Sequence, residues 1–142
     1  MESLHPLVIH FPIALLLSAL LVDLLALAFK RPGWHRIALW NLTLGALGAG
    51  AAVLSGRQAA AIAKHSFEIW EVMERHEHLG YATLSLSALL AVYRWWKQDQ
   101  LTGRARLVTI IGMLILATTI SVGAYLGGRM VYEFGVGGVF GR

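Results

Sequence analysis

Two histidines near the start of the chain are the first residues whose type and spacing could do chemistry. His5 and His10, in the segment MESLHPLVIHFP, stand at the mouth of an uncharged stretch that covers residues 7–22. Imidazole is costly to place inside a bilayer, so histidines where an apolar helix begins indicate a ligand site. The sequence has no cysteine, which excludes thiolate zinc sites, iron–sulfur clusters held by the chain and covalent c-type haem. Any bound metal must therefore be held by His, Glu, Asp, Met or Tyr.

A second group of chemistry-bearing residues, in the segment ERHEH, precedes a later apolar stretch. On a helix, His76 shares a stripe with Gly80 and other small residues, which lets a flat group or another helix approach closely. His78 instead shares its face with the carboxylates of Glu71 and Glu74. This pattern predicts that His76 faces the protein interior and that His78 is more solvated.

Helical geometry separates the two N-terminal histidines from each other. Five residues turn a helix about 140° beyond a full turn, so His5 and His10 cannot share one face of a regular helix. His10 falls inside the predicted helix, whereas His5 precedes Pro6, a natural first-turn residue. We therefore expect His10 and His76 to form the ligand pair, with His5 at the lip of the site.

The elements that position these residues are membrane helices. The chain has 142 residues, of which 57% are hydrophobic and only 14% charged, and its mean hydropathy is +0.63. That is too little polar side chain to cover a soluble globule of this size. Four runs are long and apolar enough to span a bilayer, and none shows the alternation that a barrel strand needs. They cover residues 7–29, 37–54, 79–96 and 107–126.

The expected fold is all-α: one domain, residues 1–142, that forms an integral membrane four-helix bundle. Short connections between the first two and the last two helices predict antiparallel neighbours and up-down-up-down topology. The third helix is expected to begin at the N-cap Ser66 with an amphipathic, water-facing extension, or else with a surface segment at the interface. The predicted helices cover residues 7–29, 37–55, 66–97 and 107–127, followed by a glycine-rich tail, 128–142.

Charge patterning orients the bundle. The two short hairpin loops hold seven Lys or Arg residues and one Asp, whereas the opposite side holds five Lys or Arg and six Glu. By the positive-inside rule, both termini face outward, to the periplasm if this is the inner membrane of a Gram-negative cell. The basic net charge is thus a topology signal, and nucleic acid is not expected as a partner. Five of the six histidines then share the outer end: His5, His10, His65, His76 and His78.

Several motifs together resemble a known family. They are HPLVIHFPIALL at the start, Asp23 late in the first helix, ERHEH before the third apolar run, and YLGGRMVYEFGVGG near the end. These features resemble the bacterial predicted membrane proteins grouped as domain of unknown function 2231. His5 and His10 match the opening motif of that family, and His76 matches its histidine before the third helix. One position departs from it: Phe134 stands where relatives tend to carry a histidine in VYxHGVGV.

The resemblance implies a four-helix membrane module that is sometimes joined to Rieske or c-type cytochrome domains, which favours electron transfer near the outer face. The leading hypothesis is therefore a membrane b-type cytochrome that binds haem b through His10 and His76. Small residues such as Gly80 would line the macrocycle, and Arg75 and Arg129 would pair with its propionates. Expected partners are the lipid bilayer and a quinone or redox protein, and association with a second copy is left open.

Two alternatives come from other classes. The first is a divalent metal site for zinc, iron or copper, built from His5, His10, His76 or His78 with Glu71 or Glu74. The second is a cofactor-free structural subunit of a membrane complex, in which the glycine-rich helices are docking surfaces. No set of nucleophile, base and orienting group stands out, so a hydrolase is not expected.

Asp23 lies far from this site, about 20 Å from His10 along the helix at roughly 1.5 Å per residue. A carboxylate inside a membrane segment is a functional candidate by default. Asn41 or Arg94 is its expected partner, in a polar contact that links helices. Proton uptake from the inner side is the alternative role.

Overall fold

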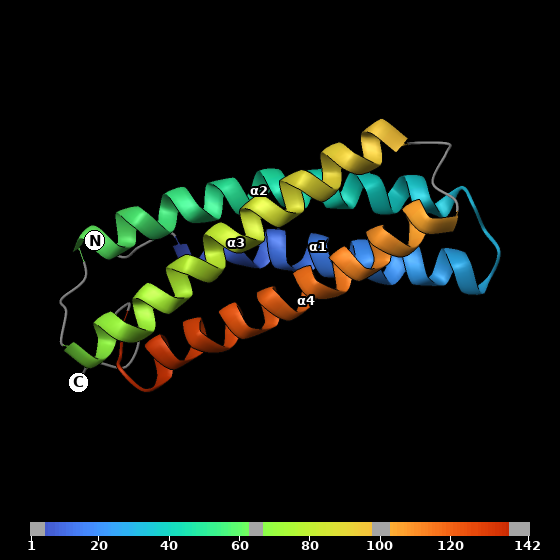
Figure 1. The fold of residues 1–142 in the computed structure, drawn as a ribbon. Helices are drawn as coiled ribbons and strands as arrows, with labels where there is room; N and C mark the ends of the chain where they lie inside the picture. Colours follow the sequence, from blue (N-terminus) through green and yellow to red (C-terminus); the bar gives the residue numbers. More distant parts are fainter. Residues whose placement is uncertain (1–4, 63–66, 98–102, 137–142) are drawn as a thin grey trace.

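The computed structural model describes residues 5–62, 67–97 and 103–136 and contains four helices (Figure 1). These are α1 (His5–Ala28), α2 (Trp34–Ile62), α3 (Phe67–Lys97) and α4 (Gly103–Tyr132). No strand occurs in the described ranges. The all-α prediction is therefore confirmed, and consecutive helices run in opposite directions along the bundle (Figure 1).

The two ends of the bundle carry different polar residues. The histidine end holds the start of α1, the end of α2, the start of α3 and the end of α4, and it contains His5 and His76 (Figure 1). The ion-pair end holds the opposite termini of the same helices and contains Asp23 and Arg94.

Helix boundaries differ from the apolar runs because helical structure continues past them. α2 extends to Ile62 and α4 to Tyr132, so the first part of the predicted tail is helical. The α2 extension is rich in residues that favour a helix, namely the alanines after Gln58. Four features of the sequence analysis lie outside the described residues: His65, Ser66, the loop at 98–102 and the tail from residue 137.

Within the described residues, three helices are long and apolar enough to cross a membrane: α1, α2 over Trp34–Ala61, and α4. α3 differs because its first three turns carry glutamates and histidines, and only its second half is apolar. The fourth predicted span, residues 79–96, lies entirely within α3 and stays a prediction. The chain is thus a helical membrane protein in which one helix has a charged half.

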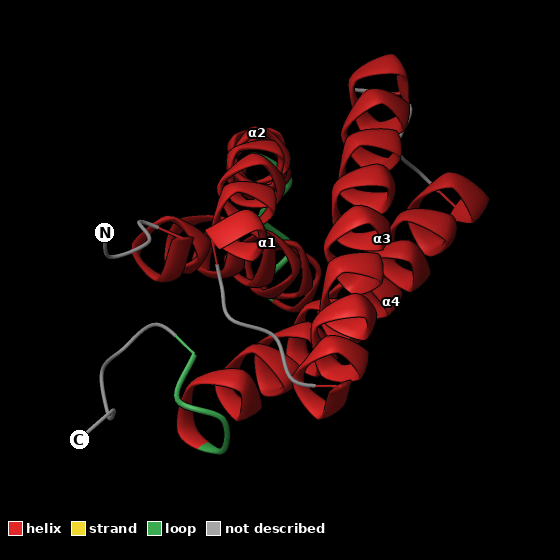
Figure 2. Ribbon diagram, turned by 90° about the vertical axis from the view of Figure 1, so that its left-hand side faces the viewer, coloured by secondary structure: helices red, strands yellow, loops and turns green. Residues whose placement is uncertain are grey.

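The helices pack so that α1 contacts α2, α2 contacts α3 and α3 contacts α4, while α1 and α4 share a smaller interface than these three pairs (Figure 2). Glycines allow the close approaches. A Cβ on Gly45 of α2 would lie 2.6 Å from Leu16 of α1, and one on Gly112 of α4 would lie 2.7 Å from Leu90 of α3. The small residues of α2 that face α1 therefore serve helix packing. The buried core includes Leu16, Leu42, Leu90, Met113, Leu116 and Ile120.

Candidate functional site

Two histidine rings lie next to each other at the histidine end. The ring centroids of His5 and His76 are 6.2 Å apart, and the ring planes are at 81°. His5 is the first residue of α1 and His76 lies in the third turn of α3. Each ring also contacts another helix: His5 reaches Ser55 of α2, and His76 reaches Gly123 of α4. All four helices therefore contribute to this pair.

Hydrogen bonds define which nitrogen of each ring carries the proton. The His76 Nδ1 lies 2.9 Å from the Gly123 carbonyl oxygen, which can only accept, so Nδ1 donates. The Ser55 hydroxyl donates its one hydrogen to the Ala52 carbonyl at 3.0 Å. It must therefore accept from the His5 Nδ1, also at 3.0 Å. When neutral, both rings carry their hydrogen on Nδ1 and a lone pair on Nε2.

A glycine lies close to each of the two rings. A Cβ on Gly56 would lie 3.1 Å from the His5 Cε1, and one on Gly127 would lie 3.2 Å from the His76 Cε1. Both separations are tighter than ordinary van der Waals contact, so a larger residue would push the ring out of place. Gly128, by contrast, has open space where its Cβ would be. The glycines at 56 and 127 thus fix the positions of the histidines.

The structure places His5, rather than His10, beside His76. His10 is exposed, and its Nδ1 lies 2.5 Å from the Pro6 carbonyl oxygen of the same helix. Because α1 already begins at His5, the two histidines are both helical and point about 140° apart. His5 faces the other helices of the bundle and contacts His76. The structure therefore differs from the expectation that His5 lies at the edge of the site.

The other predicted ligands do not join the pair. His78, Glu71 and Glu74 are all exposed on α3. Gly80 faces α2, where its Cβ would lie 3.8 Å from Val53. Within the described residues, no group of three or more His, Asp or Glu side chains lies close enough to hold a metal ion.

The two arginines expected to meet propionates are paired with glutamates of their own helices. The Arg75 Nη2 donates to Glu71 at 2.6 Å, and Arg129 binds Glu133 at 2.7–3.0 Å. The hydrogen bonds that Arg129 donates, together with its positive charge, lower the pKa of the exposed Glu133 carboxyl. Each pair spans one helical turn, so each arginine is already neutralised by a carboxylate of its own helix.

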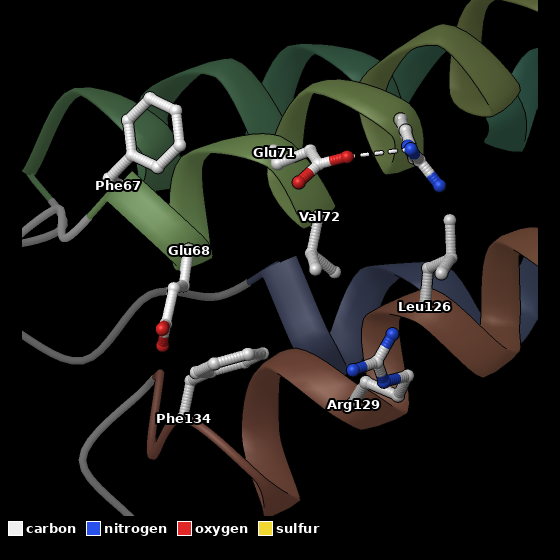
Figure 3. A pocket seen from close by; sticks show the side chains of 8 residues that line it. Phe67, Glu68, Glu71, Val72, Leu126, Arg129 and Phe134 are labelled. Atoms are coloured by element: carbon white, nitrogen blue, oxygen red, sulfur yellow. Dashed lines mark hydrogen bonds and ion pairs between the residues drawn. The ribbon is translucent and has the colours of Figure 1, made fainter.

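Beside these pairs lies an open groove of about 590 Å³ between the start of α3 and the end of α4 (Figure 3). Phe134, which follows α4, lines it opposite Glu68 (Figure 3). The side chain of Phe134 therefore faces this groove. The other lining residues are Phe67, Glu71, Val72, Arg75, Leu126 and Arg129.

A buried ionic cluster occupies the other end of the bundle. The Arg94 guanidinium binds both Asp23 oxygens, at 2.5 and 3.2 Å, and donates to the His35 carbonyl at 2.9 Å. The His35 Nδ1 lies 2.8 Å from Asp23 Oδ1. Asp23 and Arg94 are only 3% and 2% exposed. The expected pairing of Asp23 with Arg94 is confirmed, whereas Asn41 bonds to Ser18 instead.

His35 is the member of this cluster that the sequence analysis missed. It lies in the first turn of α2, outside the apolar run that defined that helix. The signal was the short turn at Pro32 and Gly33, which brings the start of α2 back beside the end of α1. Because the two helices are antiparallel, a histidine in the first turn of the second helix lies level with a carboxylate near the end of the first helix.

These features define a class of protein: a helical membrane protein with a buried ion pair at one end and a histidine pair at the other. The chain belongs to the family described as predicted membrane protein, DUF2231, whose model matches residues 1–139. Neither a curated protein nor a solved structure shows significant similarity to it.

Proposed function

We propose that the protein is a membrane electron-transfer protein that binds haem b through the Nε2 atoms of His5 and His76. The observation that carries the proposal is the hydrogen bonding of the pair, in which an oxygen acceptor holds the Nδ1 of each ring. Metal-ligating histidines typically donate their second ring nitrogen to such an acceptor, which fixes the tautomer and the ring orientation. His5 thus replaces His10 as the partner of His76.

The number of ligands favours haem over a single metal ion. Structural zinc takes four protein ligands and catalytic zinc three, but the described residues offer no group of three His, Asp or Glu side chains at this end. Haem brings nitrogen ligands of its own, so His5 and His76 would be enough to hold it. Two histidines without a carboxylate are therefore a suitable donor set for haem.

The separation of the rings also fits two ligands on one iron. With metal–nitrogen bonds of about 2.0–2.1 Å, imidazoles on opposite sides of one metal have ring centres roughly 6 Å apart. The His5 and His76 centroids are 6.2 Å apart.

The chain's own residues would hold and tune the group. Ser55 and the Gly123 carbonyl orient the two imidazoles, and hydrogen bonds of this kind raise the basicity of the ligating nitrogens. When bound, the haem supplies one-electron chemistry. The charge asymmetry of the loops supports an orientation with the histidine end at the outer face of a bacterial inner membrane and both termini outside. A quinone or a redox protein at that face is the proposed partner.

Absorbance spectra of protein purified in detergent from haem-supplied cells test the proposal. We expect Soret and α bands in the wild type and their loss in His5→Ala and His76→Ala. His10→Ala is the matched control, since it removes an exposed histidine five residues further along the same helix and should retain the bands.

Three results would overturn the proposal. One is protein without a haem band despite an ample supply of haem. Another is loss of the bands in His10→Ala together with retention in His5→Ala, which would restore the pair expected from sequence. The third is stoichiometric zinc or copper without porphyrin in elemental analysis, which would instead assign a metal-ion site.

A further inference from the structure

A small basic cavity lies at the ion-pair end, away from the histidine pair. Its volume is about 240 Å³, and it is bounded by the end of α1, the following turn and the start of α4. Three cationic or titratable side chains line it, Lys30, His35 and Arg106. The other lining residues, Ala26, Leu27 and Pro32, are apolar. A cavity lined by both cations and apolar groups suits an amphipathic anion.

Lys30 occupies a backbone position that normally favours glycine. After α1, the Arg31 amide donates to the Ala26 carbonyl at 2.9 Å and the Lys30 amide to the Leu27 carbonyl at 3.3 Å. This pair of bonds is the Schellman motif, and Lys30 takes its left-handed position with a φ of 53°. A lysine there is less stable than a glycine because its Cβ crowds the backbone. The position therefore keeps a lysine at a cost in stability, and that lysine lines the cavity.

The cations of the cavity lack carboxylate partners within the described residues. Neither Lys30 nor Arg106 forms an ion pair there, and the buried Nε of Arg106 has no hydrogen-bond partner. Asp23 is the carboxylate of this end, and Arg94 and His35 already bind it. Asp99 lies outside the described residues. An acceptor-rich anion would complete the cavity by accepting from Arg106 and neutralising Lys30.

We propose that this cavity binds the phosphate of an anionic phospholipid headgroup. It lies at one end of the three described helices that are long enough to cross a membrane, and the ends of such helices are where lipid headgroups meet a membrane protein. Basic pockets between membrane helices are suited to anionic headgroups, and the apolar lining residues Ala26, Leu27 and Pro32 suit the start of an acyl chain. A free phosphate offers the same oxygens but makes no contact of this apolar kind. The proposal does not depend on haem binding at the other end.

The test measures the thermal stability of detergent-purified protein titrated with phosphatidylglycerol, phosphatidylcholine or inorganic phosphate. We expect phosphatidylglycerol to raise the Tm and phosphatidylcholine to leave it unchanged. Lys30→Gly should weaken the apparent affinity for phosphatidylglycerol about fivefold, as for loss of one cation beside a headgroup. Without lipid, Lys30→Gly should be at least as stable as the wild type, because it relieves the left-handed lysine.

Arg31→Gln is the matched control. It removes one positive charge from the neighbouring, exposed residue that does not line the cavity, and it should leave the affinity nearly unchanged. An equal loss of affinity in Arg31→Gln and Lys30→Gly would overturn the proposal, since it would mean a diffuse surface-charge effect. Equal protection by phosphatidylcholine would overturn it as well. Equal protection by inorganic phosphate would overturn the assignment to a lipid.

Discussion

The two ends of the bundle use buried polar groups in opposite ways. At the ion-pair end, Asp23 and Arg94 bind each other, and His35 binds the same carboxylate. At the histidine end, His5 and His76 each bind an oxygen through Nδ1, with no hydrogen bond to either Nε2 among the described residues. The first arrangement satisfies its charges internally, and the second leaves the two Nε2 atoms without a hydrogen bond. The first arrangement links helices, and the second is the basis of the proposed binding site.

The ion pair explains how such a bundle fixes its helix arrangement. Asp23 and Arg94 belong to α1 and α3, which are not neighbours in sequence, and His35 adds α2. The Arg94 guanidinium also approaches the Met113 sulfur of α4 at 3.7 Å. One buried arginine thus contacts the other three helices, so it sets their depth relative to one another at that end.

Breaking this ion pair should have the largest effect on stability. Arg94→Ala leaves Asp23 buried without its main partner, and such losses cost about 3–5 kcal/mol. Replacing both partners by apolar residues, in Asp23→Leu/Arg94→Met, should cost less than Arg94→Ala alone because no charge stays buried. Unfolding in detergent, followed by circular dichroism, measures both variants. A double variant that is less stable than Arg94→Ala would contradict this expectation. It would mean that the attraction between Asp23 and Arg94 outweighs the free energy of burying their charges.

Crowding the histidine end should have an intermediate effect that is seen first in binding. Gly127→Ala places a methyl group 3.2 Å from the His76 ring, and overpacking of this kind costs about 1–3 kcal/mol. We expect the ring to shift and the haem content of purified protein, measured by absorbance, to fall. Gly128→Ala meets open space and should retain haem, with a gain of up to about 1 kcal/mol from helix propensity. Equal haem contents in the two variants would contradict a fixed position of His76.

The ion-pair end was easier to predict from sequence than the histidine end. Asp23 and Arg94 are charged residues at the ends of apolar runs on the same side of the membrane, and burial in lipid leaves them few partners. Which histidine faces inward depends on the rotation of α1 about its axis. α1 is apolar on all sides, so its sequence carries almost no signal of which face is buried. The choice between His5 and His10 therefore needed the packing of α2, through Ser55 and Gly56.

The fold itself was predictable because a bilayer allows so few alternatives. Apolar length marked the helices, but it did not mark their ends, since α2 and α4 continue into polar sequence beyond the hydrocarbon length. The same limit hid His35, which follows the turn and precedes the apolar run of α2. Contacts made just outside the apolar runs depend on helix ends and turns, which hydropathy does not resolve.

The surface ion pair Arg129–Glu133 gives the smallest expected effect. The pKa of Glu133 is lowered in the folded protein by its bonds to Arg129, so the folded state holds this proton more weakly than the unfolded chain. The contribution to stability is therefore present above the ordinary glutamate pKa and is lost as the pH falls through the lowered one. Glu133→Gln should leave the Tm near neutral pH almost unchanged and slightly reduce its fall in acid. Because the pair is exposed, added salt should make even that difference in Tm smaller. A large change in Tm at neutral pH would contradict this prediction. It would mean that Arg129 and Glu133 also support the groove beside Phe134.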